Sequence, residues 1–287
     1  MATRLQGAHV AIVGLGMMGG SLAGALRGRC SRVTGVARRA ATVEAALVRG
    51  LVDSGTTDLA EGLRQADIVV LAMPVRAILR RLAEIGRLVP AGCLVLDLGS
   101  TKVQIVGEMA RLPEHVEPVG GHPMCGRELA GLDAADPALF SGRTFILTPL
   151  ERTSKAALAL ACELAQASGA DPLVLEPERQ DRLAATLSHL PYLLACALVS
   201  TARAATSADP AARKIPAGGY RDVSRLAGSD VTMWTDILLT NRAEVLRALD
   251  AFQVQLGELH RLVEAADESS LRATLTSVRA ERMRMYT

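Results

Sequence analysis

Short apolar runs in the first half of the chain alternate with segments whose apolar residues recur at helical spacing. Residues 10–13 (VAIV) and 68–71 (IVVL) are continuously apolar, with no polar residue between the apolar ones. A strand has this composition when helices bury both of its faces, as in a parallel sheet. The pattern predicts strands at residues 9–13, 32–36, 67–72, 93–98, 117–121, 144–148 and 173–175.

Helical periodicity fills the intervals between these strands and dominates the chain after them. The expected helices cover residues 21–27, 40–49, 78–88, 102–111, 154–168, 179–205 and 231–266. Pro191 has no N–H for the carbonyl of Leu187, which predicts a kink close to His189. The order of elements predicts an α/β fold, with a Rossmann-type doubly wound domain over residues 1–175 and an all-helical domain over residues 176–287.

The last predicted helix carries a heptad pattern. Its apolar residues are Leu238, Val245, Phe252 and Leu259, seven residues apart, with Leu249, Leu256 and Val263 between them. Such a seam is either a core stripe within one subunit or the contact between two subunits. The pattern leaves both interpretations open, and we expect the helical domain to form a homodimer.

Composition narrows the classes of partner. Of 287 residues, 49% are hydrophobic and only 2% aromatic, so the core is aliphatic, which suits helices and parallel strands. The net charge is +2 and the Lys and Arg residues are scattered, which favours neither a nucleic-acid nor a membrane partner.

The five cysteines are far apart and form no CxxC pair, so we expect reduced thiols, no disulfide framework and no metal site. A glycine-rich turn at Gly14 interrupts the first apolar stretch, and no run approaches 18 uninterrupted apolar residues. These features predict a cytoplasmic protein without a secretory leader or a membrane span.

The segment GLGMMG at residues 14–19 directly follows the first predicted strand and opens a helix. In this context Gly14 permits a tight turn, Gly16 lets the backbone approach a pyrophosphate, and Gly19 allows close packing of helix on strand. The helix N-terminus supplies N–H groups for the phosphates. The predicted cofactor-binding residues of this turn are Gly14, Gly16, Met17, Met18 and Gly19.

The end of the second strand indicates which dinucleotide is bound. An NAD enzyme usually has Asp or Glu there, about 20 residues after the turn, to hold the ribose 2′-hydroxyl. This chain has Arg38 and Arg39 instead, after Val36 and Ala37. Two guanidinium groups can hold a 2′-phosphate through forked hydrogen bonds. We therefore expect the cofactor to be NADP, with Arg38 and Arg39 as further cofactor-binding residues.

Two polar segments end consecutive strands at the carboxyl edge, where ligands of open α/β sheets bind. They are DLGSTK (97–102) and GGHPMCG (120–126). The glycines and the proline around His122 are expected to fix its imidazole at a loop tip, and a neutral imidazole that titrates near pH 6.5 suits a proton acceptor. Ser100 lies in the first segment.

The chain resembles the prephenate/arogenate dehydrogenases of tyrosine biosynthesis. The resemblance rests on GLGMMGGSLA (14–23), DLGSTK, GGHPMCG, SHLPYLLACAL (188–198) and YRDVSRLAGSD (220–230). It implies an oxidative decarboxylation in which hydride passes from the carbinol carbon of a cyclohexadienol to the nicotinamide and CO₂ leaves. It further implies that His122 hydrogen-bonds the ring hydroxyl, that Ser100 contacts the same region, and that Arg225 binds a substrate carboxylate from the helical domain.

Several residues keep more than one interpretation. His189 either orients substrate-side groups or braces the two domains. Lys102 is either a cofactor-side charge or a charge at a helix start, and Cys125 is interpreted as a small packing residue. The choice between prephenate and arogenate stays open, with NADP favouring arogenate only by association. Neither a fused chorismate mutase nor a regulatory ligand-binding domain is expected.

Two alternative functions use the same turn. A β-hydroxyacid dehydrogenase of the 6-phosphogluconate type needs a catalytic lysine in the helical domain, where Lys214 is the only lysine after Lys155. A non-catalytic NADP-sensing module would have no need of His122, Ser100 and Arg225 together. Both alternatives leave the GGHP segment unexplained.

Overall fold

The computed structural model describes residues 4–215 and 217–285, and the chain divides into two compact units after residue 242. The first unit contains the whole sheet and the helices up to α11 (Val231–Thr240). The second consists of α12 (Arg242–Glu264) and α13 (Glu268–Arg284), joined by a short turn. The domain boundary predicted at residue 175 stays a prediction.

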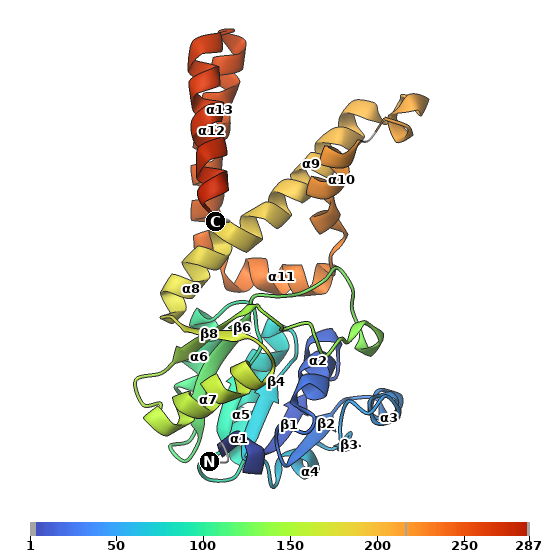
Figure 1. Cartoon of the computed structure of the whole chain (residues 1–287), viewed down its shortest axis with the longest axis vertical. Coiled ribbons are helices and arrows are strands. Elements are labelled where there is room, and N and C mark those ends of the chain that lie inside the picture. The colour runs from blue at the N-terminus through green and yellow to red at the C-terminus, as the bar shows by residue number, and fades with distance from the viewer. Residues whose placement is uncertain (1–3, 216, 286–287) are drawn as a thin grey trace. The chain divides into compact units, whose positions relative to one another are not determined.

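One eight-stranded sheet has the order β3-β2-β1-β4-β5-β6-β7-β8 (Figure 1). All neighbouring pairs are parallel except β6 and β7, which are antiparallel. This arrangement confirms the Rossmann-type fold. The strands are β1 (His9–Val13), β2 (Arg32–Val36), β3 (Ser54–Thr56), β4 (Ile68–Leu71), β5 (Leu94–Asp97), β6 (Glu117–Pro123), β7 (Thr144–Pro149) and β8 (Asp171–Val174).

Helices cover both faces of the sheet, as the continuous apolar strands predict. In β1, Val10 and Ile12 belong to a core formed with α2 and α7, whereas Ala11 and Val13 belong to a second core formed with α5 and α6. The covering helices are α1 (Arg4–Gly7), α2 (Met17–Leu26), α3 (Ala40–Val48), α4 (Leu59–Leu63), α5 (Val75–Leu88), α6 (Val103–Met109) and α7 (Lys155–Ala167).

A continuous helix follows β8 and contains the predicted irregularity. α8 (Pro177–Ala184) leads through a π-helical turn, Ala185–His189, into α9 (Leu190–Thr206). The wider turn lies directly before Pro191 and accommodates the carbonyl that proline cannot bond. By length and composition this is the one helix of the described chain that could span a membrane; its most apolar window has a mean hydropathy of 1.6 and is 28% buried.

The single helix predicted over residues 231–266 is wrong, because the helix ends at Asn241. The side chain of Asn241 donates to the carbonyl of Asp181 at 2.7 Å, and its backbone leaves the helical conformation. Leu238 therefore lies on α11, and the heptad seam is confined to α12. The remaining elements are η1 (Leu132–Ala134), η3 (Pro210–Arg213), α10 (Gly218–Ser224) and η4 (Arg225–Gly228).

Candidate active site

The glycine turn between β1 and α2 has the predicted geometry. Gly14 has a φ of 105°, which L side chains rarely adopt. A Cβ on Gly19 would lie 1.9 Å from the carbonyl oxygen of Gly14, so only glycine lets the helix pack this closely. Gly16 is the N-cap of α2, has no side-chain cap, and has open space around the position of a Cβ. The turn therefore fits a dinucleotide pyrophosphate at a helix N-terminus.

The end of β2 lies beside this turn, because the amide of Gly14 donates to the carbonyl of Val36 at 2.8 Å. Arg38 and Arg39 follow at once and are exposed. Within the described ranges neither guanidinium has an ion pair or a side-chain hydrogen bond. Both charges are thus available to a ligand that binds at the turn.

His122 lies within a strand, and the predicted loop tip is wrong. β6 extends to Pro123 because β7 pairs with it there, with His122 opposite Ile146. The parallel partner β5 pairs with β6 only as far as Val119. His122 is therefore paired with β7 alone, at a point where β5 has already ended. It keeps its place at the carboxyl edge of the sheet with only 7% of its surface exposed.

The imidazole of His122 is held through Nδ1, which lies 2.8 Å from Nε2 of Gln180. The same amide nitrogen donates to the carbonyl of Ser100 at 3.3 Å, so Gln180 connects the two predicted catalytic positions. Burial lowers the pKa of His122 to about 3, and the charges of Lys102 and His189 act in the same direction. His122 is consequently neutral at physiological pH. Its pKa lies well below the value near 6.5 that the sequence suggests.

Lys102 is the N-cap residue of α6, so its charge lies at a helix start, and its side chain is completely buried. Its ammonium forms a completely buried ion pair with Asp97 and donates to the carbonyl of Gly121 at 2.7 Å. Burial lowers the pKa of Lys102 and raises that of Asp97, while the opposite charge of each partner counteracts the shift. The pair ties the end of β5 to the residue before His122.

Asp181 of α8 caps α6 from a distance. Its carboxylate accepts hydrogen bonds from the amides of Lys102 at 2.7 Å and Val103 at 3.0 Å. The sequence pattern singles out neither Gln180 nor Asp181, since polar residues near a helix start are usually exposed. The available signal was spacing: in a regular helix Asp181 shares one face with His189, eight residues later, and both side chains are buried.

His189 is 1% exposed and contacts α11. Its Nδ1 lies 3.3 Å from Nδ2 of Asn241, and its ring meets Trp234 edge-on with centroids 6.0 Å apart. Nε2 is buried without a partner, and burial lowers the pKa of His189 to about 4. These contacts place the His189 ring between α9 and α11, where it packs the two helices together.

Arg225 begins η4, and within the described chain no hydrogen bond or ion pair joins it to His122, Ser100 or Gln180. It pairs with Glu128 in the loop after β6, and its side chain is 61% exposed. A substrate carboxylate would compete with Glu128 for this guanidinium. The structure therefore brings His122 and Ser100 together through Gln180, while Arg225 is joined to the loop that follows His122.

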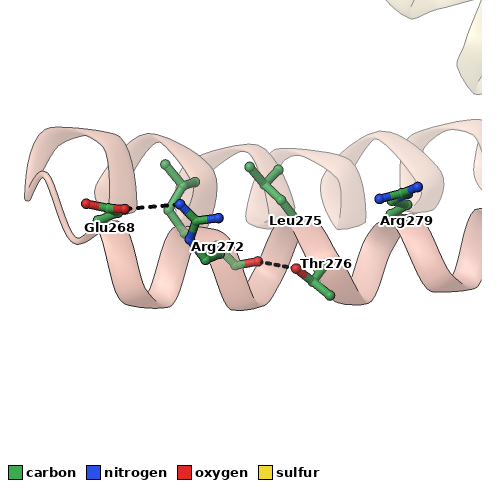
Figure 2. A pocket seen from close by; sticks show the side chains of 6 residues that line it. Glu268, Arg272, Leu275, Thr276 and Arg279 are labelled. Carbon is green, nitrogen blue, oxygen red and sulfur yellow. Dashed lines mark hydrogen bonds and ion pairs between the residues drawn. The ribbon is translucent and has the colours of Figure 1, made fainter.

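Other features of the described chain offer no comparable site. A groove on α13 is lined by residues of that helix alone, where Arg272 pairs with Glu268 (Figure 2). All five cysteines are free thiols, and burial raises the pKa of Cys125 to about 11. Among the described residues no group of three or more His, Cys, Asp or Glu side chains could hold a metal ion.

Comparisons with known proteins identify the family to which the chain is similar. The family model for the nucleotide-binding domain of prephenate dehydrogenase matches residues 22–174, and the model for its dimerization domain matches residues 176–277. The prephenate dehydrogenase of Bacillus subtilis (strain 168) is 32% identical over 266 residues, which cover 91% of this chain and 72% of that protein.

Two solved structures are similar over nearly the whole chain. Prephenate dehydrogenase from A. aeolicus, in complex with hydroxyphenyl propionate and NAD+, is 32% identical with a TM-score of 0.91 and covers 99% of this chain and 100% of its own. Synechocystis arogenate dehydrogenase is 30% identical with a TM-score of 0.84 and covers 96% of this chain and 99% of its own.

Proposed function

Since the chain belongs to the prephenate dehydrogenase family, we propose that it catalyses the oxidative decarboxylation of prephenate, arogenate or both, with NADP as the hydride acceptor. The observation that carries this proposal is a buried, neutral His122 at the carboxyl edge of the sheet, beyond the glycine turn of a dinucleotide-binding fold. Family membership removes the β-hydroxyacid dehydrogenase alternative.

The bound nicotinamide would supply the acceptor for the hydride that leaves the carbinol carbon of the ring. His122 takes the proton of the hydroxyl on that carbon as the hydride departs. The ring carboxylate then leaves as CO₂, its bonding electrons enter the ring, and the aromatic product forms. The oxygen becomes a phenolate, to which His122 can return the proton. Because burial keeps the imidazole neutral, the ring carries only one proton and can take up a second.

Ser100 and Arg225 are proposed to orient the substrate. Ser100 is half-buried at the same edge as His122 and shares with it the amide of Gln180. Arg225 presents a largely exposed guanidinium with the fork geometry that suits a carboxylate. The ion pair with Glu128 keeps that guanidinium near the loop that follows His122, and a substrate carboxylate would take its place or share it.

His189 is proposed to brace α9 against α11 and not to contact substrate. Its ring is enclosed by Trp234 and Asn241, and 1% exposure leaves it little access to a ligand. This role differs from bracing the two predicted domains, because α9 and α11 both lie within the predicted helical domain.

The preference for NADP is supported by charge at the end of β2. Arg38 and Arg39 are exposed and unpaired beside the glycine turn, and the position lacks the carboxylate that would bind a ribose 2′-hydroxyl. A guanidinium pair favours a 2′-phosphate by charge-assisted hydrogen bonds. The A. aeolicus relative was solved with NAD+, so cofactor preference has to be measured on this chain.

A homodimer through the helical segment and a cytoplasmic location complete the proposal. The helix Pro177–Thr206 is only 28% buried over its most apolar window, and α12 and α13 expose Leu256, Val263, Leu275 and Val278 by more than half. A second copy would cover such apolar surface. Sedimentation equilibrium at micromolar concentration should give twice the mass of the chain, and a monomer there would contradict the dimer.

The decisive experiment measures turnover of prephenate and arogenate, each with NADP and with NAD. We expect release of CO₂ together with reduced cofactor from at least one substrate, with NADP giving the higher kcat/KM. Failure of all four combinations with folded protein would support a non-catalytic NADP-binding module. A preference for NAD would contradict only the proposed role of Arg38 and Arg39, and the proposed reaction would stand.

A further inference from the structure

Gln180 reaches from α8 to the catalytic edge and is completely buried. Its amide nitrogen is within hydrogen-bonding distance of the Ser100 carbonyl, at 3.3 Å, and of Nδ1 of His122, at 2.8 Å. Its Oε1 is buried and has no partner. A buried amide with one end bonded twice and the other unsatisfied needs an explanation, because an unpaired buried acceptor costs free energy.

The contact with Gln180 leaves Nε2 as the reactive nitrogen of His122. Within the described chain Nε2 has no hydrogen-bond partner, and it keeps some exposed surface. It is therefore the nitrogen that a ligand can reach. Whatever happens at Nε2 changes the proton at Nδ1, since the two nitrogens share one ring.

The two contacts of Gln180 are compatible with each other, but the orientation that they share conflicts with proton acceptance at Nε2 of His122. The Ser100 carbonyl can only accept, so it selects the orientation in which the amide nitrogen faces both it and His122. In that orientation Nδ1 accepts, and neutral His122 carries its proton on Nε2. To take a proton at Nε2, however, the ring must carry its own proton on Nδ1. That N–H can donate only to the oxygen of the amide.

We propose that Gln180 is a positioning residue that sets the tautomer of His122. With its nitrogen at Nδ1 the amide holds the resting tautomer, which is protonated at Nε2; after the amide rotates, its oxygen accepts from Nδ1–H and stabilises the proton-accepting tautomer. The amide itself carries no proton: one proton leaves Nε2 for solvent and one solvent proton is taken up at Nδ1. This inference rests on the proposed role of His122 as proton acceptor. It gives the unpaired Oε1 a function, because the oxygen is the acceptor that Nδ1–H requires when the amide rotates. The Ser100 carbonyl favours return to the resting orientation.

Among the described residues no carboxylate forms a hydrogen bond or ion pair with the ring of His122. The charged and titratable groups that face His122 are Lys102 at the start of α6 and His189 at the end of the π turn. Asp97 is engaged by Lys102 and two backbone amides, and Asp181 by the amides that begin α6. Since its partner at Nδ1 is a neutral amide, His122 gains no stabilisation of its charged form, and burial lowers its pKa to about 3.

Two substitutions of Gln180 separate this switch from simple packing. Gln180→Leu fills the space but neither donates nor accepts, and kcat should fall about ten- to hundredfold with little change in KM. Gln180→Glu supplies an acceptor for Nδ1–H, so its kcat should exceed that of the leucine variant. An ionised carboxylate also raises the pKa of a neighbouring histidine, which should bring an acid limb of kcat into the measurable range. Gln104→Leu is the matched control, because that amide also donates to a backbone carbonyl, that of Thr240, but does not touch His122.

NMR of protein labelled with ¹⁵N-histidine tests the switch without turnover. His122 is identified by the signal lost in His122→Asn. In the wild type Nε2 should carry the proton, and in Gln180→Glu the proton should move to Nδ1 and the pKa should rise by about one unit or more. Identical His122 signals in the wild type and both Gln180 variants would overturn the proposal. Expected signals in a protein that turns over neither substrate would instead contradict the proposed function and leave the switch intact.

Discussion

Lys102 and Asp97 form an ion pair in which neither side chain has any exposed surface. The Asp97 carboxylate also accepts from the amides of Gly99 at 2.7 Å and Gly121 at 2.9 Å. Removing two charges from water costs about as much as their attraction returns, so such a pair contributes little net stability. Its effect here is geometric, because it joins the end of β5 to the residue that precedes His122.

Breaking that pair should destabilise the fold. Lys102→Met leaves a buried carboxylate without its counter-ion, and the free energy of unfolding in urea should fall by about 3–5 kcal/mol. Lys155→Met is the control, because Lys155 is exposed at the start of α7. Asp97→Asn combined with Lys102→Met should recover part of the loss. A Lys102→Met variant as stable as the wild type would show that the pair is not maintained in solution.

Stability should fall as the solution is acidified from pH 7 to pH 5. Burial lowers the pKa of His122 to about 3 and of His189 to about 4, from an ordinary value of 6.5. Between these values the unfolded chain binds protons that the folded chain does not, so stability is complete above pH 6.5 and is lost below it. Each histidine should contribute a loss of about 2 kcal/mol at pH 5.

Urea titrations at the two pH values measure this dependence. Replacing either buried histidine by Asn should remove about half of it, whereas His115→Asn should not, because His115 is exposed before β6. If the free energy of unfolding still falls by the same amount between pH 7 and pH 5 in both buried-histidine variants, other groups cause the acid sensitivity.

His122→Asn should lower kcat by about 10²–10⁴-fold, the usual contribution of a positioned acid–base group. Asparagine can still hydrogen-bond the ring hydroxyl but cannot take its proton, so KM should change less than kcat. Because the pKa of His122 is lowered to about 3, the wild type should show no acid limb near pH 6.5 from this residue. His115→Asn provides the control, and near-normal turnover in His122→Asn would remove His122 from the mechanism.

Arg225→Ala should mainly raise KM for the substrate. A guanidinium that binds a carboxylate acts on the bound ground state and the transition state alike, so kcat should be nearly unchanged. Arg221→Ala is the matched control, one turn earlier on α10 and also exposed. Steady-state kinetics in which the Arg225 variant loses kcat at constant KM would contradict the proposed role.

Replacing Arg38 and Arg39 by Ala should raise KM for NADP by about tenfold or more and leave KM for NAD nearly unchanged. The reason is the loss of charged hydrogen bonds to the 2′-phosphate, each worth about 1.5–3 kcal/mol. Arg29→Ala removes the same charge at the opposite end of β2, where no cofactor contact is expected. Equal effects on both cofactors would mean that the two arginines do not distinguish them.

Local chemistry was sufficient to predict the dinucleotide fold from the sequence. The run VAIV at residues 10–13 can only be buried on both faces, and the glycine at position 14 adopts the positive φ that its turn requires. The family resemblance likewise rests on contiguous segments such as GGHPMCG. Each of these features is complete within a few neighbouring residues, so it can be interpreted without knowing what packs against it.

Tertiary structure decided what surrounds the histidine. Gln180, 58 residues from His122, holds its Nδ1, and Asp181 caps a helix that begins 78 residues earlier. The antiparallel ladder of β7 keeps His122 in a strand, and Asn241 ends a helix that periodicity alone would continue. The energy of these contacts depends on burial and on partners that are distant in the chain. An amide or a carboxylate is solvated unless the fold removes its water, and only the folded chain determines which ones lose it.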